Sequence, residues 1–240
     1  MIKYCLLLLI VLYSKQVTAQ HIQFNVHNNW EFRKKGAGEW LKAKVPLTVH
    51  TDLLANKKIE DPFYRTNEKD QQWIDTTDWE YQTTIVVNDN LLKHDKIEII
   101  FEGLDTYADV YVNDRKVIGA DNMFLLWKAD IKKELKVGAN KLHIGYHSPI
   151  NKVLPTYDCI PYQVPISNND QTENRLSVFT RKAGYHYGWD WCPRLLTSGI
   201  WSPVAIYVWN LASINDLYFK QLRIEGNSAN LEADVTTSST

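Results

Sequence analysis

The side chains best suited to chemistry are concentrated in one segment, residues 181–194. Five aromatic rings there lie close in sequence to a single carboxylate, Asp190, and they belong to Tyr185, His186, Tyr187, Trp189 and Trp191. Aromatic faces pack against the CH-lined faces of sugar rings, and a carboxylate accepts two hydrogen bonds from neighbouring hydroxyl groups. The segment therefore predicts a carbohydrate site centred on Asp190. The alternative is a turn carboxylate bonded to backbone amides.

Other kinds of catalytic site find little support in the remaining residues. His143 and His147 are four residues apart, but on a predicted strand this spacing does not build the helical zinc face. No glycine-rich phosphate loop is present, and no Ser-His-Asp set can be nominated. We expect neither a metal nor a cofactor.

The charge balance excludes two classes of partner. Lys and Arg number 27 against 28 Asp and Glu, so there is no broad basic field to neutralise phosphates or bind an anionic membrane. We expect neither nucleic acid nor a membrane as a partner. The 45% hydrophobic content is that of a folded globular protein.

Residues 1–19 have the pattern of a signal peptide. A basic start is followed by an apolar run too short to span a bilayer, and Val17, Thr18 and Ala19 form a small-residue cleavage site. We expect export, to a periplasmic, lysosomal or extracellular location depending on the organism. A buried first strand or a retained anchor is the alternative. Cys159 and Cys192 would remain in the mature chain, and their spacing does not decide between a disulfide and two separate thiols.

Short β-rich segments separated by turn residues predict an all-β sandwich. They are residues 21–26, 30–33, 79–87, 96–101, 108–112, 116–120, 124–128, 141–146 and 203–209. Asn113 and Asp114 favour a two-residue hairpin turn. We expect one short helix over residues 51–56, capped by Thr51. The lone strand tryptophans are expected in the core: Trp30, Trp79, Trp127 and Trp209.

Two stretches depart from this pattern. Residues 147–177 contain four prolines and predict an ordered irregular loop folded onto the sandwich, with disorder as the alternative. Residues 210–215 predict a linker, and the segments after it predict new strands too few to bury a second core. We interpret residues 213–240 as the start of a truncated immunoglobulin-like domain. A terminal strand pair packed on the first domain is the alternative.

The run Tyr187-Gly188-Trp189-Asp190-Trp191, followed by Gly199-Ile200-Trp201, closely resembles the motif of β-mannosidases of glycoside hydrolase family 2. Other stretches agree in the same order, among them residues 45–54, 59–68, 72–74, 79–81 and 101–113. The resemblance covers about residues 24–235. Two positions depart from it, because Cys192 and Leu47 stand where glycine is common.

This resemblance implies a jelly-roll (galactose-binding-like) domain over residues 20–212, followed by an immunoglobulin-like domain and a TIM barrel that carries both catalytic glutamates beyond position 240. The substrate would be a β-mannoside, whose terminal mannose is released with retention. Asp190 would hold ring hydroxyls, Trp189 would form a wall of the subsite at the barrel mouth, and Arg181 would support the loop.

No catalytic pair is predicted within the chain itself. Retaining hydrolysis needs two carboxyl groups about 5 to 5.5 Å apart. The other acidic candidates lie in charged, turn-like segments where we expect solvated or turn-capping roles: Glu60, Asp61, Glu68, Asp70, Asp75, Asp78 and Asp121. We therefore expect the segment alone to be inactive. A stand-alone carbohydrate-binding module and a purely structural sandwich are the alternative functions.

Overall fold

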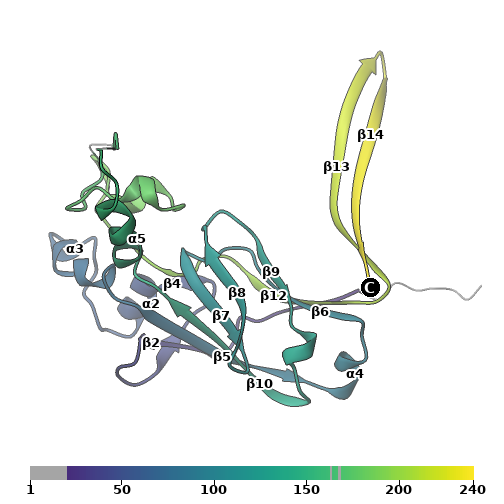
Figure 1. Cartoon of the computed structure of the whole chain (residues 1–240), viewed down its shortest axis with the longest axis horizontal. Coiled ribbons are helices and arrows are strands. Elements are labelled where there is room, and N and C mark those ends of the chain that lie inside the picture. The colour runs from purple at the N-terminus through teal and green to yellow at the C-terminus, as the bar shows by residue number, and fades with distance from the viewer. Residues whose placement is uncertain (1–20, 163, 167–168) are drawn as a thin grey trace, which may run out of the picture.

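Two antiparallel sheets form the body of the protein (Figure 1). The computed structural model describes residues 21–162, 164–166 and 169–240, so the predicted signal peptide lies outside the described residues. One sheet has the order β1 (His21–Asn25), β12 (Val204–Trp209), β6 (Lys96–Phe101), β9 (Trp127–Asp130). The other has the order β3 (Leu41–Ala43), β2 (Trp30–Lys34), β5 (Trp79–Val87), β10 (Gly138–Tyr146), β7 (Tyr107–Val112), β8 (Arg115–Asp121). The predicted all-β sandwich is confirmed.

Alternating side chains explain why these segments form sheets. Along β5, Tyr81 and Ile85 are buried while Glu80 and Gln82 face outward, as the two-residue period of a strand requires. The core joins the inner faces of the two sheets, and each large apolar side chain buried there contributes roughly 1.5–3 kcal/mol. Of the four strand tryptophans expected in this core, three are buried and Trp127 is only partly buried.

Turn and cap residues fix where several elements begin. Asn113 and Asp114 both adopt positive φ, 46° and 67°, which confirms the predicted hairpin between β7 and β8. Helix α2 (Val49–Ala55) begins two residues before the predicted start. Thr48 rather than Thr51 is its N-cap, because the Thr51 hydroxyl instead accepts from the Thr48 backbone amide at 3.0 Å in a capping box.

Residues 147–177 contain more regular structure than predicted. Helix α5 (Pro149–Asp158) occupies ten of them, so the expectation of an irregular loop is wrong for this part. Ser148 caps the helix by accepting from the Asn151 amide at 3.0 Å, and Pro149 stands in the first turn, where its missing N–H costs nothing. Pro149 therefore marks the start of a helix, and the helix continues through Pro155.

The remaining short elements lie mainly at the two ends of the sandwich. They are β4 (Leu47–Thr48), paired with β11 (Gly199–Ile200), and the helical turns α3 (Asn67–Asp70), η1 (Gln72–Ile74), α4 (Asp89–Leu92), η2 (Lys132–Glu134), η3 (Ser177–Phe179) and η4 (Gly184–Tyr187). Figure 1 shows α2, α3 and α5 gathered at one end. No helix in the described part of the chain is long and apolar enough to cross a membrane.

The last two strands form a separate long hairpin. β13 (Ala212–Glu225) pairs with β14 (Ser228–Ser239) and stands away from the sandwich (Figure 1). The residues predicted as a linker therefore contribute to β13 from Ala212 onward, which corrects that expectation. Large apolar side chains along the hairpin are exposed, including Leu217, Phe219, Leu222 and Leu231. The domain boundary near residue 212 remains a prediction.

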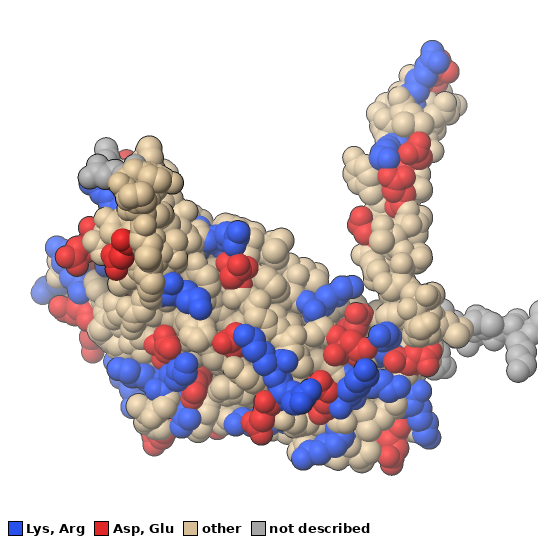
Figure 2. Space-filling view, in the orientation of Figure 1, with Lys and Arg blue, Asp and Glu red and all other residues tan. Residues whose placement is uncertain are grey.

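The charged side chains are evenly distributed over the face of the sandwich shown in Figure 2, and the two cysteines of the sandwich are not bonded to each other. Figure 2 shows acidic and basic side chains interspersed over the visible face, in keeping with the balanced composition. Cys159 and Cys192 are separate thiols rather than a disulfide.

Candidate functional site

Trp189 to Cys192 form a tight turn that presents its two central residues to solvent. The backbone amide of Trp189 donates to the carbonyl of Cys192 at 3.3 Å, and that of Cys192 donates to the carbonyl of Trp189 at 3.4 Å. Asp190 and Trp191 occupy the tip. Trp191 is 82% exposed and Trp189 is 38% exposed. The turn thus offers two accessible indoles with a carboxylate between them in sequence.

The Asp190 carboxylate is exposed and accepts no hydrogen bond from any residue that the structure describes. The alternative of a carboxylate occupied by backbone amides therefore does not hold. The five rings of the segment do not act together, because Tyr187 is fully buried in a second apolar cluster with Val153, Leu176 and Leu196. What remains available to a ligand at the turn is one carboxylate and two indoles.

Gln171 holds the turn on its amino-terminal side. Its backbone amide donates to the carbonyl of Tyr187 at 2.8 Å, and its side-chain amide donates to the carbonyl of Trp189 at 3.3 Å. Gly188 between them has φ +112°, and a Cβ at this position would lie 2.7 Å from the Gln171 side chain. Only glycine combines that φ with such a close approach.

Asp170 gives Gln171 a fixed support. Its buried carboxylate accepts from the backbone amide of Thr172 at 2.9 Å and from that of Ser177 at 2.8 Å. These bonds close the loop that carries Gln171, so the amino-terminal anchor of the turn is itself ordered by a local network.

An ion pair between Arg194 and Asp75 holds the turn on its carboxy-terminal side. Asp75 is 3% exposed, so the expectation that it is solvated is wrong. Burial raises the pKa of Asp75 to about 6, and the Arg194 guanidinium partly offsets this shift. The side chain of Gln72 adds a hydrogen bond to the carbonyl of Arg194 at 3.1 Å.

A second buried ion pair lies beneath the segment. Lys182 and Asp105 are paired and fully buried, and the Lys182 ammonium also donates to the carbonyl of Thr197 at 2.8 Å. Burial lowers the pKa of Lys182, and Asp105 opposes that shift. The backbone of Asp105 pairs with Gly199 through two bonds of 2.9 Å. Lys182 therefore joins the residues before the turn to those after it.

Gly199 in the family motif has a steric explanation. Its φ is +153°, and a Cβ there would lie 2.7 Å from the carbonyl oxygen of Leu47. The residue allows β11 to approach β4 closely and so fixes the end of the segment on the sandwich.

Arg181 lies at the base of the segment, where its guanidinium pairs with Asp121 at 3.0 Å. Both side chains are exposed, and the carbonyl of Arg181 accepts from the Met123 amide at 3.0 Å. The structure thus brings Trp189 and Asp190 together in the turn and places Arg181 at the edge of β8. The assignment of the three residues to a sugar site remains a prediction.

An apolar groove of about 350 Å³ lies beside the base of the turn. Cys192 and Pro193 line it, together with Phe63 and Leu54. His186 also lines it, and burial, followed by the charge of Lys182, lowers its pKa to about 4. The groove therefore presents uncharged surface at neutral pH and is suited to apolar contact rather than to proton transfer.

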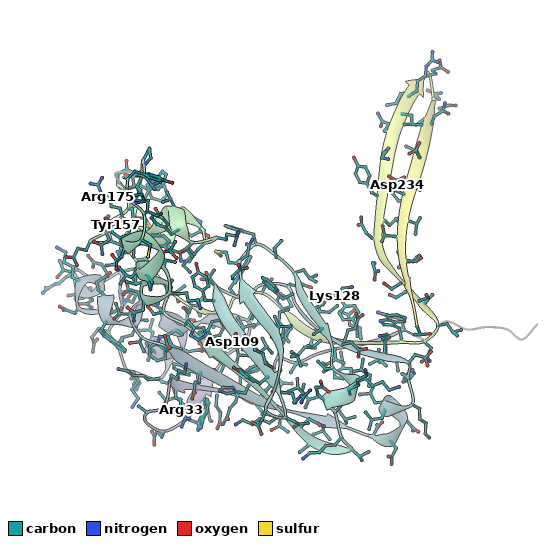
Figure 3. The ribbon with its side chains drawn as sticks, viewed as in Figure 1. Arg33, Asp109, Lys128, Tyr157, Arg175 and Asp234 are labelled. Atoms are coloured by element: carbon teal, nitrogen blue, oxygen red, sulfur yellow. The ribbon has the colours of Figure 1, made fainter. Side chains whose placement is uncertain are left out.

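Another hollow, of about 580 Å³, lies between the end of α5 and the segment 173–179. Tyr157 and Arg175, labelled in Figure 3, belong to its lining. Across the described residues there is no group of three or more His, Cys, Asp or Glu side chains arranged to hold a metal ion.

Comparison with known proteins places this geometry in a family. The model of the glycosyl hydrolase 2 galactose-binding domain-like family matches residues 30–202. Beta-mannosidase B of Emericella nidulans is 36% identical over 204 residues, which cover 83% of this chain and 23% of that protein. Beta-mannosidase of Mus musculus is 29% identical over 220 residues, 89% of this chain and 25% of that protein. The chain thus spans about a quarter of the length of these relatives.

Solved structures agree with the sequence comparison. Beta-D-mannosidase from Dictyoglomus thermophilum superposes with a TM-score of 0.85 at 35% identity, covering 91% of this chain and 26% of that chain. Beta-D-glucuronidase from the same organism superposes with a TM-score of 0.59 at 19% identity, covering 94% and 34%, and so shares the fold alone. The chain therefore belongs to glycoside hydrolase family 2, and residues 30–202 are its galactose-binding-like domain.

Proposed function

We propose that this chain is the sugar-binding portion of an exported enzyme that releases terminal β-D-mannose from oligosaccharides with retention. The observation that carries the proposal is the exposed Asp190 carboxylate, which has no partner among the described residues and lies on a turn anchored from both sides. The β-mannosidase relatives support the choice of mannose over other sugars.

In this role, Asp190 accepts hydrogen bonds from two adjacent hydroxyls of the terminal sugar. The Trp189 indole packs against the CH-lined face of the same ring. The bonds from Gln171 and the ion pair of Arg194 hold the turn before the sugar arrives, so little conformational entropy is lost on binding. Arg181 supports the base of the segment through Asp121.

The catalytic glutamates belong to a barrel outside these 240 residues. Retention requires two carboxyl groups about 5 to 5.5 Å apart. Three of the acidic candidates in this chain are already occupied: Asp75 pairs with Arg194, Asp121 pairs with Arg181, and Asp78 accepts from the Ser148 amide at 2.8 Å. We expect the 240-residue chain alone not to hydrolyse an aryl β-mannoside, and hydrolysis by it would refute this part.

The test of the sugar subsite is Asp190→Asn in the full-length enzyme, measured as kcat/KM on an aryl β-mannoside. A hydrogen bond to a charged group contributes about 1.5–3 kcal/mol, so kcat/KM should fall roughly ten- to hundredfold. Asp89→Asn is the matched control, because it changes another exposed aspartate that is distant from Asp190 in the sequence, and it should leave kcat/KM unchanged. Equal values for both variants would contradict the proposal.

Export is a separate element of the proposal and rests on residues 1–19 alone. Expression of the full-length gene in its own host should yield a mature protein that begins at Gln20. Amino-terminal sequencing of the mature protein tests this, and a retained Met1 would refute it.

A further inference from the structure

The outward face of the six-stranded sheet carries a hollow of about 250 Å³, built from residues other than those of the turn. Its floor is Gly145 on β10, which pairs directly with Glu80 on β5 and with Asp109 on β7. A Cβ at Gly145 would meet nothing within 4 Å, so the space above this backbone is open. Figure 3 labels Asp109 near the middle of the sheet.

Aromatic rings wall one end of this hollow. The rings of Tyr111 and His143 lie side by side, with their centroids 5.7 Å apart and their planes at 46°. Both side chains are partly buried and both line the hollow. They offer the apolar surface that the CH-lined face of a sugar ring packs against.

The polar groups of the hollow are held in place by their neighbours, but some of their hydrogen-bonding capacity is unoccupied. One oxygen of Glu80 accepts from Arg33 at 2.8 Å, while its other oxygen lies 3.8 Å from Nε2 of His143. At the other end, His147 contacts Asp109 through Nε2 at 2.9 Å, while its Nδ1 lies 3.8 Å from a carboxylate oxygen of Asp78.

Separations of 3.8 Å are too long for a hydrogen bond. A hydroxyl group placed beside such a pair can accept from an imidazole N–H and donate to the carboxylate at the same time. The hollow therefore has one such position, between His143 and Glu80, where a ligand hydroxyl completes a hydrogen-bond network that the protein leaves open. At the other end, His147 donates to Asp109 through Nε2, so its Nδ1 can accept from a ligand hydroxyl.

Three of the four carboxylates around the hollow are paired with cations, and the fourth, Asp114, forms no ion pair with a described residue. The cations Lys35, Arg33 and Lys116 pair with the anions Asp78, Glu80 and Asp109, respectively. The local field is therefore slightly negative, which disfavours an anionic ligand. The fit is to a neutral molecule that carries hydroxyl groups on its edge and CH groups on its face.

We infer that this hollow is a second saccharide site, which takes one neutral pyranose ring of an oligosaccharide. Pockets for drug-sized ligands have roughly 300–1,000 Å³, so a slightly smaller hollow suits a single ring. The site lies on the sheet face and shares no residue with the turn at Asp190. It does not depend on the function proposed for that turn.

The test is NMR titration of the 240-residue chain with mannotriose and with cellotriose. Asp190→Asn is used as the background, so that binding at the turn does not contribute. We expect a Kd on the order of 1 mM, so each sugar is added up to a concentration of about ten times that value. The Gly145 amide signal should shift during either titration.

Gly145→Leu fills the hollow and should weaken the binding at least about tenfold, followed in this variant by the amide of the neighbouring Ile144 because the Gly145 signal is lost. Thr84→Leu places the same side chain on the outward face of β5 outside the hollow and should leave binding unchanged. Tyr111→Thr removes the aromatic wall while keeping a strand-forming residue, and it gives a second measurement if Gly145→Leu does not fold.

The proposal is overturned if neither sugar shifts the Gly145 amide. It is also overturned if the folded Gly145→Leu and Tyr111→Thr chains bind as the background does. Binding that persists in Asp190→Asn and disappears with Gly145→Leu supports this site, and it does so whether or not the turn at Asp190 binds sugar.

Discussion

The ion pair between Arg194 and Asp75 gives a prediction whose size depends on pH. Asp75 is 3% exposed, and its pKa of about 6 lies above the ordinary value of 3.8. The folded protein therefore holds this proton more tightly than the unfolded chain, so the Asp75 contribution to stability falls as pH rises from 3.8 to about 6. In Arg194→Met the cation that offsets burial is absent, and this fall should continue above pH 6.

The magnitude follows from the charge state of Asp75. At pH 8 the carboxylate is ionised in the wild-type protein, and breaking a buried ion pair costs about 3–5 kcal/mol. At pH 4 the carboxyl is already protonated in the folded wild-type protein, so Arg194→Met removes only a hydrogen bond and costs about 1 kcal/mol. Protonation of Asp75 in the variant limits the loss at pH 8 to the lower end of the range, about 3 kcal/mol.

Urea unfolding of both proteins at pH 4 and pH 8, followed by tryptophan fluorescence, measures this difference. Arg181→Met is the matched control, because it removes the exposed pair with Asp121 and should cost under about 1 kcal/mol at either pH. A loss of unfolding free energy for Arg194→Met that is the same at pH 4 and pH 8 would refute the reasoning.

Gly199→Ala should lower the unfolding free energy by about 1–3 kcal/mol, because φ +153° and the carbonyl of Leu47 leave no room for a Cβ. Gly184→Ala, where a Cβ meets nothing within 4 Å, should change it by less than about 0.5 kcal/mol, and urea unfolding compares the two. Burial, then the charge of Lys182, lowers the pKa of His50 from 6.5 to about 4, so its contribution to stability is present above pH 6.5 and lost as pH falls through 4. When the pH falls from 6.5 to 4, the unfolding free energy of the wild type should therefore drop by up to about 3 kcal/mol more than that of His50→Leu. Equal drops in the two proteins would contradict this.

Alternation of side chains made the strands of the sandwich predictable. Along β7, Val110 and Val112 are buried and alternate with Asp109 and Tyr111, and this pattern can be read from the sequence without the partner sheet. The prolines of helix α5 hide it from a sequence reading, because proline commonly breaks helices, but Pro149 stands in the first turn, where proline is favoured. Proline favours a helix when it stands in the first turn and disfavours one when it stands in the interior.

The exposed turn was predictable, but its anchors were not. The run from Trp189 to Trp191 is dense enough in rings to be noticed in the sequence alone. Asp75 belongs to the segment Asp75-Thr76-Thr77-Asp78, which has the composition of a solvated turn. Its ion-pair partner Arg194 lies 119 residues later, and no local pattern signals such a contact.

The central claim is that Asp190 accepts hydrogen bonds from hydroxyls of the terminal sugar. A double-mutant cycle tests it directly, with kcat/KM of the full-length wild-type enzyme and Asp190→Asn on an aryl β-mannoside and on each of its monodeoxy analogues. If the claim holds, the loss from Asp190→Asn and the loss from removing either of two adjacent hydroxyls are coupled by at least about 1 kcal/mol. Additive losses for every deoxy analogue would contradict it.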